Sequence, residues 1–153
     1  MHLSHSNDIF LAAIISLAVT FLSVTKGDAL YLGTWYYLTV PFIILSLCVA
    51  IRPAPLFLTG ASLGIAITLL SVMSVNWNSS SPEGLLGLGH VSSLPGATIG
   101  VVTSAIIAKR KNITLPYTSM SMGLGGLLIG YLINQTVACN TVMWCSPLSM
   151  TIK

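Results

Sequence analysis

His90 is the side chain best placed to do chemistry, because it borders a long apolar stretch that contains few ionisable groups. Ser92 and Ser93 follow it closely, and Pro95 comes two positions later. An ionisable side chain inside a membrane helix is rare and usually serves a function. We therefore treat His90, Ser92 and Ser93 as a candidate polar site and assign no catalytic residue.

Two interpretations of His90 remain open. In the first, its imidazole sits at the level of the lipid headgroups and hydrogen-bonds to water or to the neighbouring serines. In the second, it is a proton or ligand contact beside backbone carbonyls that Pro95 leaves free. Asn134 and Gln135, near the end of a later apolar segment, are then its polar neighbours or simply hydrogen-bond formers between helices.

Cys139 and Cys145 are the second chemical feature, six positions apart in the C-terminal part of the chain. In an oxidising compartment they could form a disulfide, and the alternative is two reduced thiols. Their spacing is not the Cys-x-x-Cys of many thiol oxidoreductases, so we expect the bond to be structural. Cys48 lies within an apolar segment and is expected to be a small packing residue.

Other chemistries lack their usual groups. Asp8, Asp28 and Glu83 are expected at segment ends or in loops, with Asp8 capping the first turn of its own helix. His2 and His5 have no Cys or carboxylate at metal-ligand spacing, so no metal site and no cofactor are expected. The net charge of +3 belongs to short turns, so no nucleic-acid partner is implied.

The elements that carry these residues are apolar segments that suit a lipid bilayer. The 153 residues include only six Lys or Arg and three Asp or Glu, confined to the gaps between the segments. The sequence therefore predicts one all-helical transmembrane domain, residues 1–153, with a short outer tail over 139–153. The expected helices cover 9–24, 35–51, 56–75, 88–108 and 116–138.

The fourth segment is the least certain, because only about twelve apolar residues precede the basic cluster. A crossing needs about 20 residues, so the helix must extend back past Pro95 to residue 88. We expect that helix to be kinked, or broken and re-entrant, near Pro95. A bundle with four crossings is the alternative.

Basic residues predict the orientation. Lys109, Arg110 and Lys111 form one cluster and Arg52 lies in another short turn, and such residues are retained on the cytoplasmic side. With five crossings, the N-terminus is inside and the C-terminus outside. Trp35, Trp77 and Trp144 then all lie at the outer interface, which suits their amphipathic rings.

Small residues recur every four positions, which allows close helix packing in lipid. The stripes predict eight helix-packing residues: Gly60, Gly64, Gly96, Gly100, Ser104, Gly126, Gly130 and Asn134. They serve either to pack one bundle or to leave a stripe free for a partner or a second copy. The segment 35–51 has no such stripe, so we expect it at the periphery.

These features favour a small non-enzymatic integral membrane protein that acts through helix contacts and outer loops. An accessory subunit or an immunity-type protein of a bacterial inner membrane fits this description, with the bilayer and another membrane protein, or itself, as partners. The alternative is a small channel or transporter with a path near His90 and Pro95. A membrane-embedded enzyme acting on lipid is a weaker third option, since no polar cluster for it can be assembled.

Overall fold

The computed structural model describes residues 5–28, 30–78 and 85–141, and these form five helices. They are α1 (His5–Lys26), α2 (Thr34–Ile51), α3 (Phe57–Trp77), α4 (Leu85–Arg110) and α5 (Pro116–Thr141). Each contains a stretch long and apolar enough to cross a bilayer. The chain is therefore an all-α, multi-pass membrane protein, as the sequence predicts, and the bounds differ from the predicted ones by a few residues.

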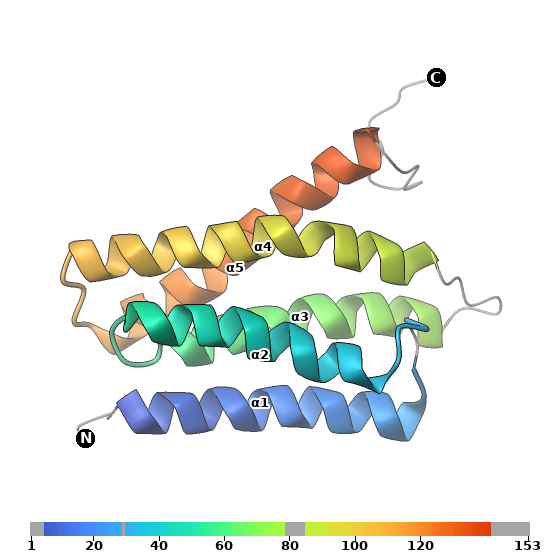
Figure 1. Cartoon of the computed structure of the whole chain (residues 1–153), viewed down its shortest axis with the longest axis horizontal. Helices are drawn as coiled ribbons and strands as arrows, with labels where there is room; N and C mark the ends of the chain where they lie inside the picture. The colour runs from blue at the N-terminus through green and yellow to red at the C-terminus, as the bar shows by residue number, and fades with distance from the viewer. Residues whose placement is uncertain (1–4, 29, 79–84, 142–153) are drawn as a thin grey trace.

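Helix α3 lies at the centre of the bundle and contacts each of the other four helices. Because neighbours surround it, α3 is buried on several sides and has no polar face. Its buried side chains include Phe57, Leu58, Ala61, Ile65, Leu69 and Met73. Helix α2 lies at the periphery, on α1, α3 and α4. Figure 1 shows α1 to α4 running roughly side by side, whereas α5 crosses behind α4 and its C-terminal half projects from the bundle.

The two ends of the bundle differ in charge. One end, here called the basic end, holds the start of α1 and the turns between α2 and α3 and between α4 and α5 (Figure 1). Its cations are Arg52, Lys109, Arg110 and Lys111, and Lys109 Nζ donates a hydrogen bond to the Ile51 carbonyl at 2.7 Å. The opposite end, here called the far end, holds the other two connections and the end of α5. The described chain therefore begins and finishes at opposite ends.

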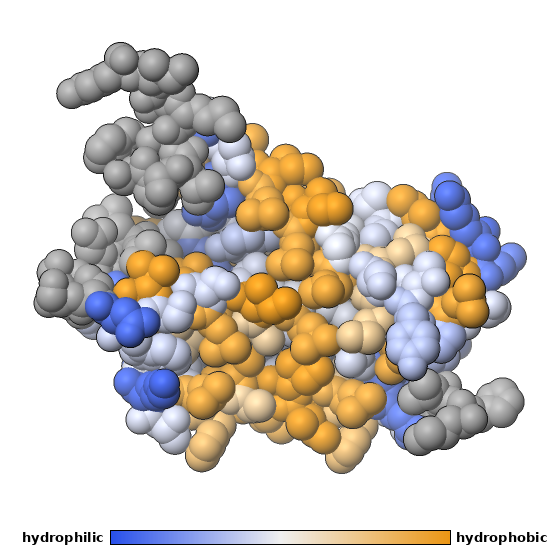
Figure 2. All heavy atoms as spheres, turned by 180° about the vertical axis from the view of Figure 1, so that it is seen from behind, coloured by the Kyte–Doolittle hydropathy of each residue, from blue (hydrophilic) through white to orange (hydrophobic). Residues whose placement is uncertain are grey.

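The surface has the pattern of a membrane protein. Figure 2 shows apolar residues covering the middle of one face, with hydrophilic residues at the two ends of the bundle. Large apolar side chains are strongly exposed, such as Phe42 at 73% and Ile99 at 67%. In lipid such exposure is ordinary, because the hydrocarbon solvates these groups.

Of the two alternatives predicted for Pro95, the broken and re-entrant helix is wrong, and the kink stays a prediction. Helix α4 runs without interruption through Pro95, so residues 88–96 cross as part of one helix and do not re-enter. Proline removes one backbone N–H and thus one hydrogen bond of the ladder. The carbonyl that loses its donor is that of Val91, and the helix continues on both sides of it while α5 packs along α4.

The boundary of the C-terminal tail also needs correction. Residues 139–141 belong to the last turn of α5, so a tail cannot begin before residue 142. Residues 142–153, including Cys145 and Trp144, lie outside the described part of the chain.

Candidate functional site

His90 lies in the first turns of α4 and is 1% exposed, enclosed by α2 and α5. Its Nδ1 is 2.6 Å from the hydroxyl oxygen of Tyr36 on α2, and the two rings meet edge to face with centroids 5.9 Å apart. On the other side, the ring of Tyr131 on α5 is tilted against the imidazole at 5.4 Å. The imidazole is thus held between two tyrosines and has Tyr36, not water or the neighbouring serines, as its hydrogen-bond partner.

The second imidazole nitrogen is the unusual atom of the site. His90 Nε2 is buried and has no hydrogen-bond partner. If Tyr36 donates its proton to Nδ1, Nε2 carries a hydrogen and is an unmet donor; in the other tautomer it is an unmet acceptor. A buried polar atom without a partner costs free energy, so it marks a place where a water, a proton or a ligand could bind.

Ser92 and Ser93 belong to a different arrangement, because they bind α5 and not the imidazole. The Ser93 hydroxyl bonds to the side-chain oxygen of Gln135, and the Asn134 amide donates to the Ser92 carbonyl. Both links join α4 to α5 near their far ends. The three residues of the predicted polar site therefore lie in adjacent turns with separate partners, and Asn134 and Gln135 act as hydrogen-bond formers between helices.

Tyr36 and Tyr131 complete the site and were not predicted as part of it. The sequence indicates Tyr36 only as an interfacial aromatic residue. The sequence did contain a hint of this pair. Tyr36 and His90 each lie in the first two turns of their helices, and both of these helices begin at the far end. What the sequence could not provide is that α2 and α4 lie next to each other.

The predicted packing residues of α4 and α5 face each other across a very short distance. A Cβ atom added to Gly100 would lie 2.2 Å from the Gly126 carbonyl oxygen, and one added to Gly130 would lie 2.2 Å from that of Gly96. The Ser104 hydroxyl and the Asn134 side chain continue the same contact, meeting Gly126 and Gly96 respectively. The backbones of α4 and α5 therefore touch, as small residues in membrane helices permit.

Gly60 and Gly64 lie in a second close contact, between α3 and the first half of α5. A Cβ on Gly60 would lie 2.1 Å from the Met120 carbonyl oxygen, and one on Gly64 would lie 3.0 Å from Leu127 Cδ2. Gly123, outside the predicted stripes, is equally close to the Phe57 carbonyl oxygen at 2.3 Å. All eight predicted packing residues thus lie in contacts inside the chain.

Asp8 has a role that the sequence analysis assigned wrongly. It lies within α1, is 1% exposed, and accepts hydrogen bonds from α3 and not from its own helix. The donors are the Leu58 N–H at 3.1 Å, the Thr59 N–H at 2.8 Å and the Thr59 hydroxyl at 2.6 Å. Helix α3 has Leu56 at its N-cap, which offers no side-chain acceptor. Asp8 supplies that cap from another helix and complements the positive N-terminal end of α3.

Asp28 organises the connection between α1 and α2 at the far end. Its carboxylate accepts the Tyr37 hydroxyl at 2.6 Å, the Gly33 N–H at 2.6 Å and the Leu30 N–H at 3.2 Å. Partial burial works to raise the pKa of Asp28, but the hydrogen bonds from Tyr37 and from the backbone outweigh it. The pKa is therefore lowered from the ordinary 3.8.

The remaining predicted residues are placed as follows. Cys139 lies in the last turns of α5 and is 2% exposed, but Cys145 is outside the described residues, so the disulfide stays a prediction. Cys48 is a buried packing residue of α2. Arg52, Lys109, Arg110 and Lys111 share the basic end. Within residues 5–28, 30–78 and 85–141 no three His, Cys, Asp or Glu side chains come close enough to hold a metal ion.

Comparison with known proteins adds no relative. No protein-family model matches the chain, and no curated protein or solved structure is similar to it. The fold and the contacts described above are therefore the basis for any statement about function.

Proposed function

We propose that this chain is a small non-enzymatic membrane protein that binds another membrane protein, as an accessory subunit or an immunity-type protein of a bacterial inner membrane does. The basic end would face the cytosol, because Lys and Arg in short turns are retained there. The end of α5 would then lie in the outer compartment, where Cys139 and Cys145 could pair.

The path of α5 carries the proposal. Its first half packs on both α3 and α4, through Gly60, Gly64 and Gly100 on those helices. Its second half has α4 as its neighbour and projects beyond the bundle in Figure 1, with Ile129 and Ile133 61% and 62% exposed. A transmembrane helix that leaves its own bundle offers a ready surface to a second protein.

The surface on α5 has the composition of a helix-docking face. Gly125, Ile129 and Ile133 follow one another at intervals of four, so they lie on one side of the helix. A Cβ on Gly125 would meet no atom within 4 Å, unlike the glycines that face α3 and α4. A small residue beside branched apolar side chains is a common contact between membrane helices. The expected occupant is a transmembrane helix of another protein.

Site-specific photo-crosslinking in the native membrane tests the proposal. A photoreactive residue at Ile133 should give one discrete protein adduct, whereas the same residue at Phe21, which is 68% exposed on α1, should give lipid adducts only. Gly125→Leu should remove the protein adduct without disturbing the fold, with Ala18→Leu on α1 as the matched control. Lipid adducts alone at Ile133, or an adduct unaffected by Gly125→Leu, would refute it.

A channel or transporter is the second candidate, and the unpaired Nε2 of His90 is the observation that favours it. A path along α4 and α5 would bring a proton or a polar solute to this atom. Protein reconstituted in liposomes with a pH gradient should then dissipate that gradient, and His90→Phe should abolish the flux. Tight vesicles with the wild-type protein would exclude proton conduction and leave the binding function as the better account.

A further inference from the structure

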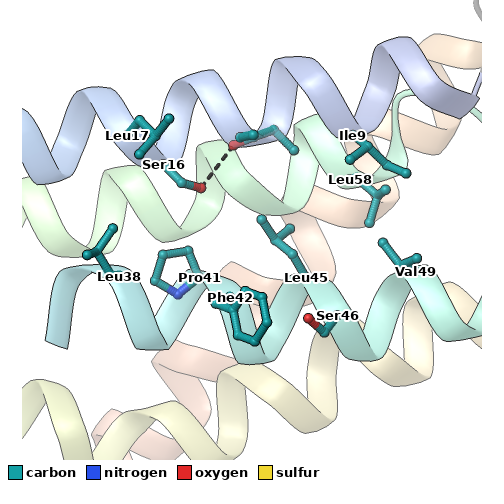
Figure 3. A pocket seen from close by; sticks show the side chains of 12 residues that line it. Ile9, Ser16, Leu17, Leu38, Pro41, Phe42, Leu45, Ser46, Val49 and Leu58 are labelled. Atoms are coloured by element: carbon teal, nitrogen blue, oxygen red, sulfur yellow. Dashed lines mark hydrogen bonds between the residues drawn. The ribbon is translucent and has the colours of Figure 1, made fainter. Parts of the chain in front are cut away.

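A cavity of about 460 Å³ opens between α1 and α2. Figure 3 shows Ile9, Ser16 and Leu17 of α1 on one side and Leu38, Pro41, Phe42, Leu45, Ser46 and Val49 of α2 on the other. Leu58 of α3 contributes to its lining. We call this cavity the α1–α2 groove. Its volume is within the range of sites that bind small molecules.

The groove exists because most of the side chains that α2 turns towards α1 are bulky, with Ser46 as the exception. Helix α1 presents Ala12, Ala13 and Ser16, but α2 presents a proline ring and branched or aromatic side chains that keep its backbone away. The Ser16 hydroxyl is already bonded to the Ala12 carbonyl at 2.9 Å, as the dashed line in Figure 3 marks. The lining is therefore almost wholly apolar, and an occupant must come from the hydrocarbon layer.

The length of the groove suits one lipid acyl chain that enters from the basic end. Along α1 it extends from Ile9 to Leu17, and along α2 from Leu38 to Val49. At 1.5 Å per residue these stretches are about 12 Å and about 16 Å, close to half of the hydrocarbon core of about 30 Å. Ile9, Val49 and Leu58 lie towards the basic end, so the groove begins there and runs past the middle of α2 to Leu38, near the start of that helix.

Positive charge stands at the entrance. Arg52 follows directly after α2, three residues beyond Val49, and its side chain is exposed. Lys109 is at the same end of the bundle, but it belongs to α4, which does not contact α1, and its ammonium is bonded to the Ile51 carbonyl at 2.7 Å. Asp8 is the carboxylate at this end, but it is buried and accepts hydrogen bonds from Thr59 of α3. Basic residues at a membrane surface attract anionic lipid headgroups.

We propose that the α1–α2 groove holds one acyl chain of an anionic phospholipid whose headgroup lies at the basic end, with the phosphate near Arg52. The chain fills the space that the side chains leave open. The headgroup is selected by charge. The site is separate from the docking face on α5 and does not depend on the function proposed above.

Native mass spectrometry of the full chain tests the lipid. Phosphatidylglycerol and phosphatidylcholine with identical acyl chains are offered together, and the wild-type protein should retain one phosphatidylglycerol with a preference of about fivefold per basic contact. Arg52→Gln should lower that preference without removing the acyl-chain binding. Equal retention of the two lipids by the wild-type protein would overturn the charge selection and with it the proposal.

Groove-filling variants test the location. Ser46→Phe and, independently, Ala13→Phe should abolish the retained lipid, whereas Val75→Phe, on an exposed position of α3 at the far end, should not. Thermal unfolding of each variant in detergent confirms that it is folded. Retention of lipid by both groove variants would refute the site. Photo-crosslinking from Ser46 to a second copy or to another protein would also overturn it, because the groove would then hold a helix.

Discussion

The α4–α5 pair and the α1–α2 pair are both antiparallel neighbours joined by a short connection, yet they pack in opposite ways. Between α4 and α5 the backbones touch, since Gly96 and Gly100 meet Gly126 and Gly130. Between α1 and α2 a cavity of about 460 Å³ remains. The difference lies in complementarity, because α4 and α5 both carry small residues in register, whereas α1 faces the bulky side of α2.

The comparison shows what a stripe of small residues can and cannot do. Ala12, Ser16 and Thr20 of α1 repeat every four positions, as the glycines of α4 do. Helix α1 nevertheless makes its closer contacts with α3 and leaves the groove open towards α2. A stripe therefore closes an interface only when its partner is equally small. The predictions below probe this contrast.

The largest effect is expected at Gly100. Gly100→Ala places a methyl group against the Gly126 carbonyl and should destabilise the protein by about 1–3 kcal/mol, because the two backbones must separate. Gly125→Ala, on the same pair of helices, meets open space and should instead stabilise by about 0.5 kcal/mol. Thermal unfolding in detergent measures both. Equal effects at the two positions would show that the backbones are not in contact.

The next effect concerns how the start of α1 is held, since its hydrogen bond to α2, from the Thr20 hydroxyl to the Tyr37 carbonyl at 3.2 Å, lies towards the other end of the helix. Asp8→Ala leaves two backbone N–H groups and the Thr59 hydroxyl unmet, so it should destabilise the protein by about 2 kcal/mol. Thr59→Val removes only the hydroxyl and should cost less. A double-mutant cycle should reveal coupling between the two residues. If the free-energy changes of the two single variants simply add in the double variant, Asp8 does not bind the start of α3.

A smaller effect is expected within the groove. Ser46→Leu adds an apolar side chain where space is available, so its effect on stability in detergent should stay within about 0.5 kcal/mol of the wild type. Gly100→Leu, the corresponding change in the closed contact, should unfold the protein or prevent its insertion. Similar losses of stability in the two leucine variants would mean that the groove is closed in solution.

The smallest effect is at the connection between α1 and α2. Because the pKa of Asp28 is lowered in the folded protein, its stabilising contribution is present above pH 3.8 and is lost as the pH falls through the lower folded value. Trp77, whose indole N–H donates to the Gly27 carbonyl, should report this by a change in fluorescence. Asp28→Asn should be insensitive over that range. An unchanged titration in the variant would assign the transition to another group.

Much of the fold could be predicted, because lipid imposes simple rules on sequence. Apolar length gave the five helices, and small residues at intervals of four indicated that Gly96, Gly100, Gly126 and Gly130 would pack. The continuity of α4 was missed because Pro95 was weighed alone, without the packing of α5 along the helix. Local sequence signals cannot show which helix packs there.

The sites were harder to predict than the fold, since they depend on which helices become neighbours. Asp8 looked like a cap for its own helix, and only the approach of α1 to α3 gives it Leu58 and Thr59 as partners. The same holds for Tyr36 and Tyr131 around His90, which come from helices far apart in the sequence. The α1–α2 groove results from poor fit between the facing surfaces of α1 and α2, and no sequence pattern marks it.

The central claim is that the chain crosses the membrane five times with its basic end in the cytosol. Alkaline phosphatase, which is active only in the oxidising outer compartment, should be active when fused after Thr141. Green fluorescent protein inserted after Asn112, in the turn between α4 and α5, should fluoresce in the cytosol. An inactive phosphatase at the first position together with a dark fluorescent protein at the second would contradict the topology, the cytosolic side of the lipid site and the outer docking face.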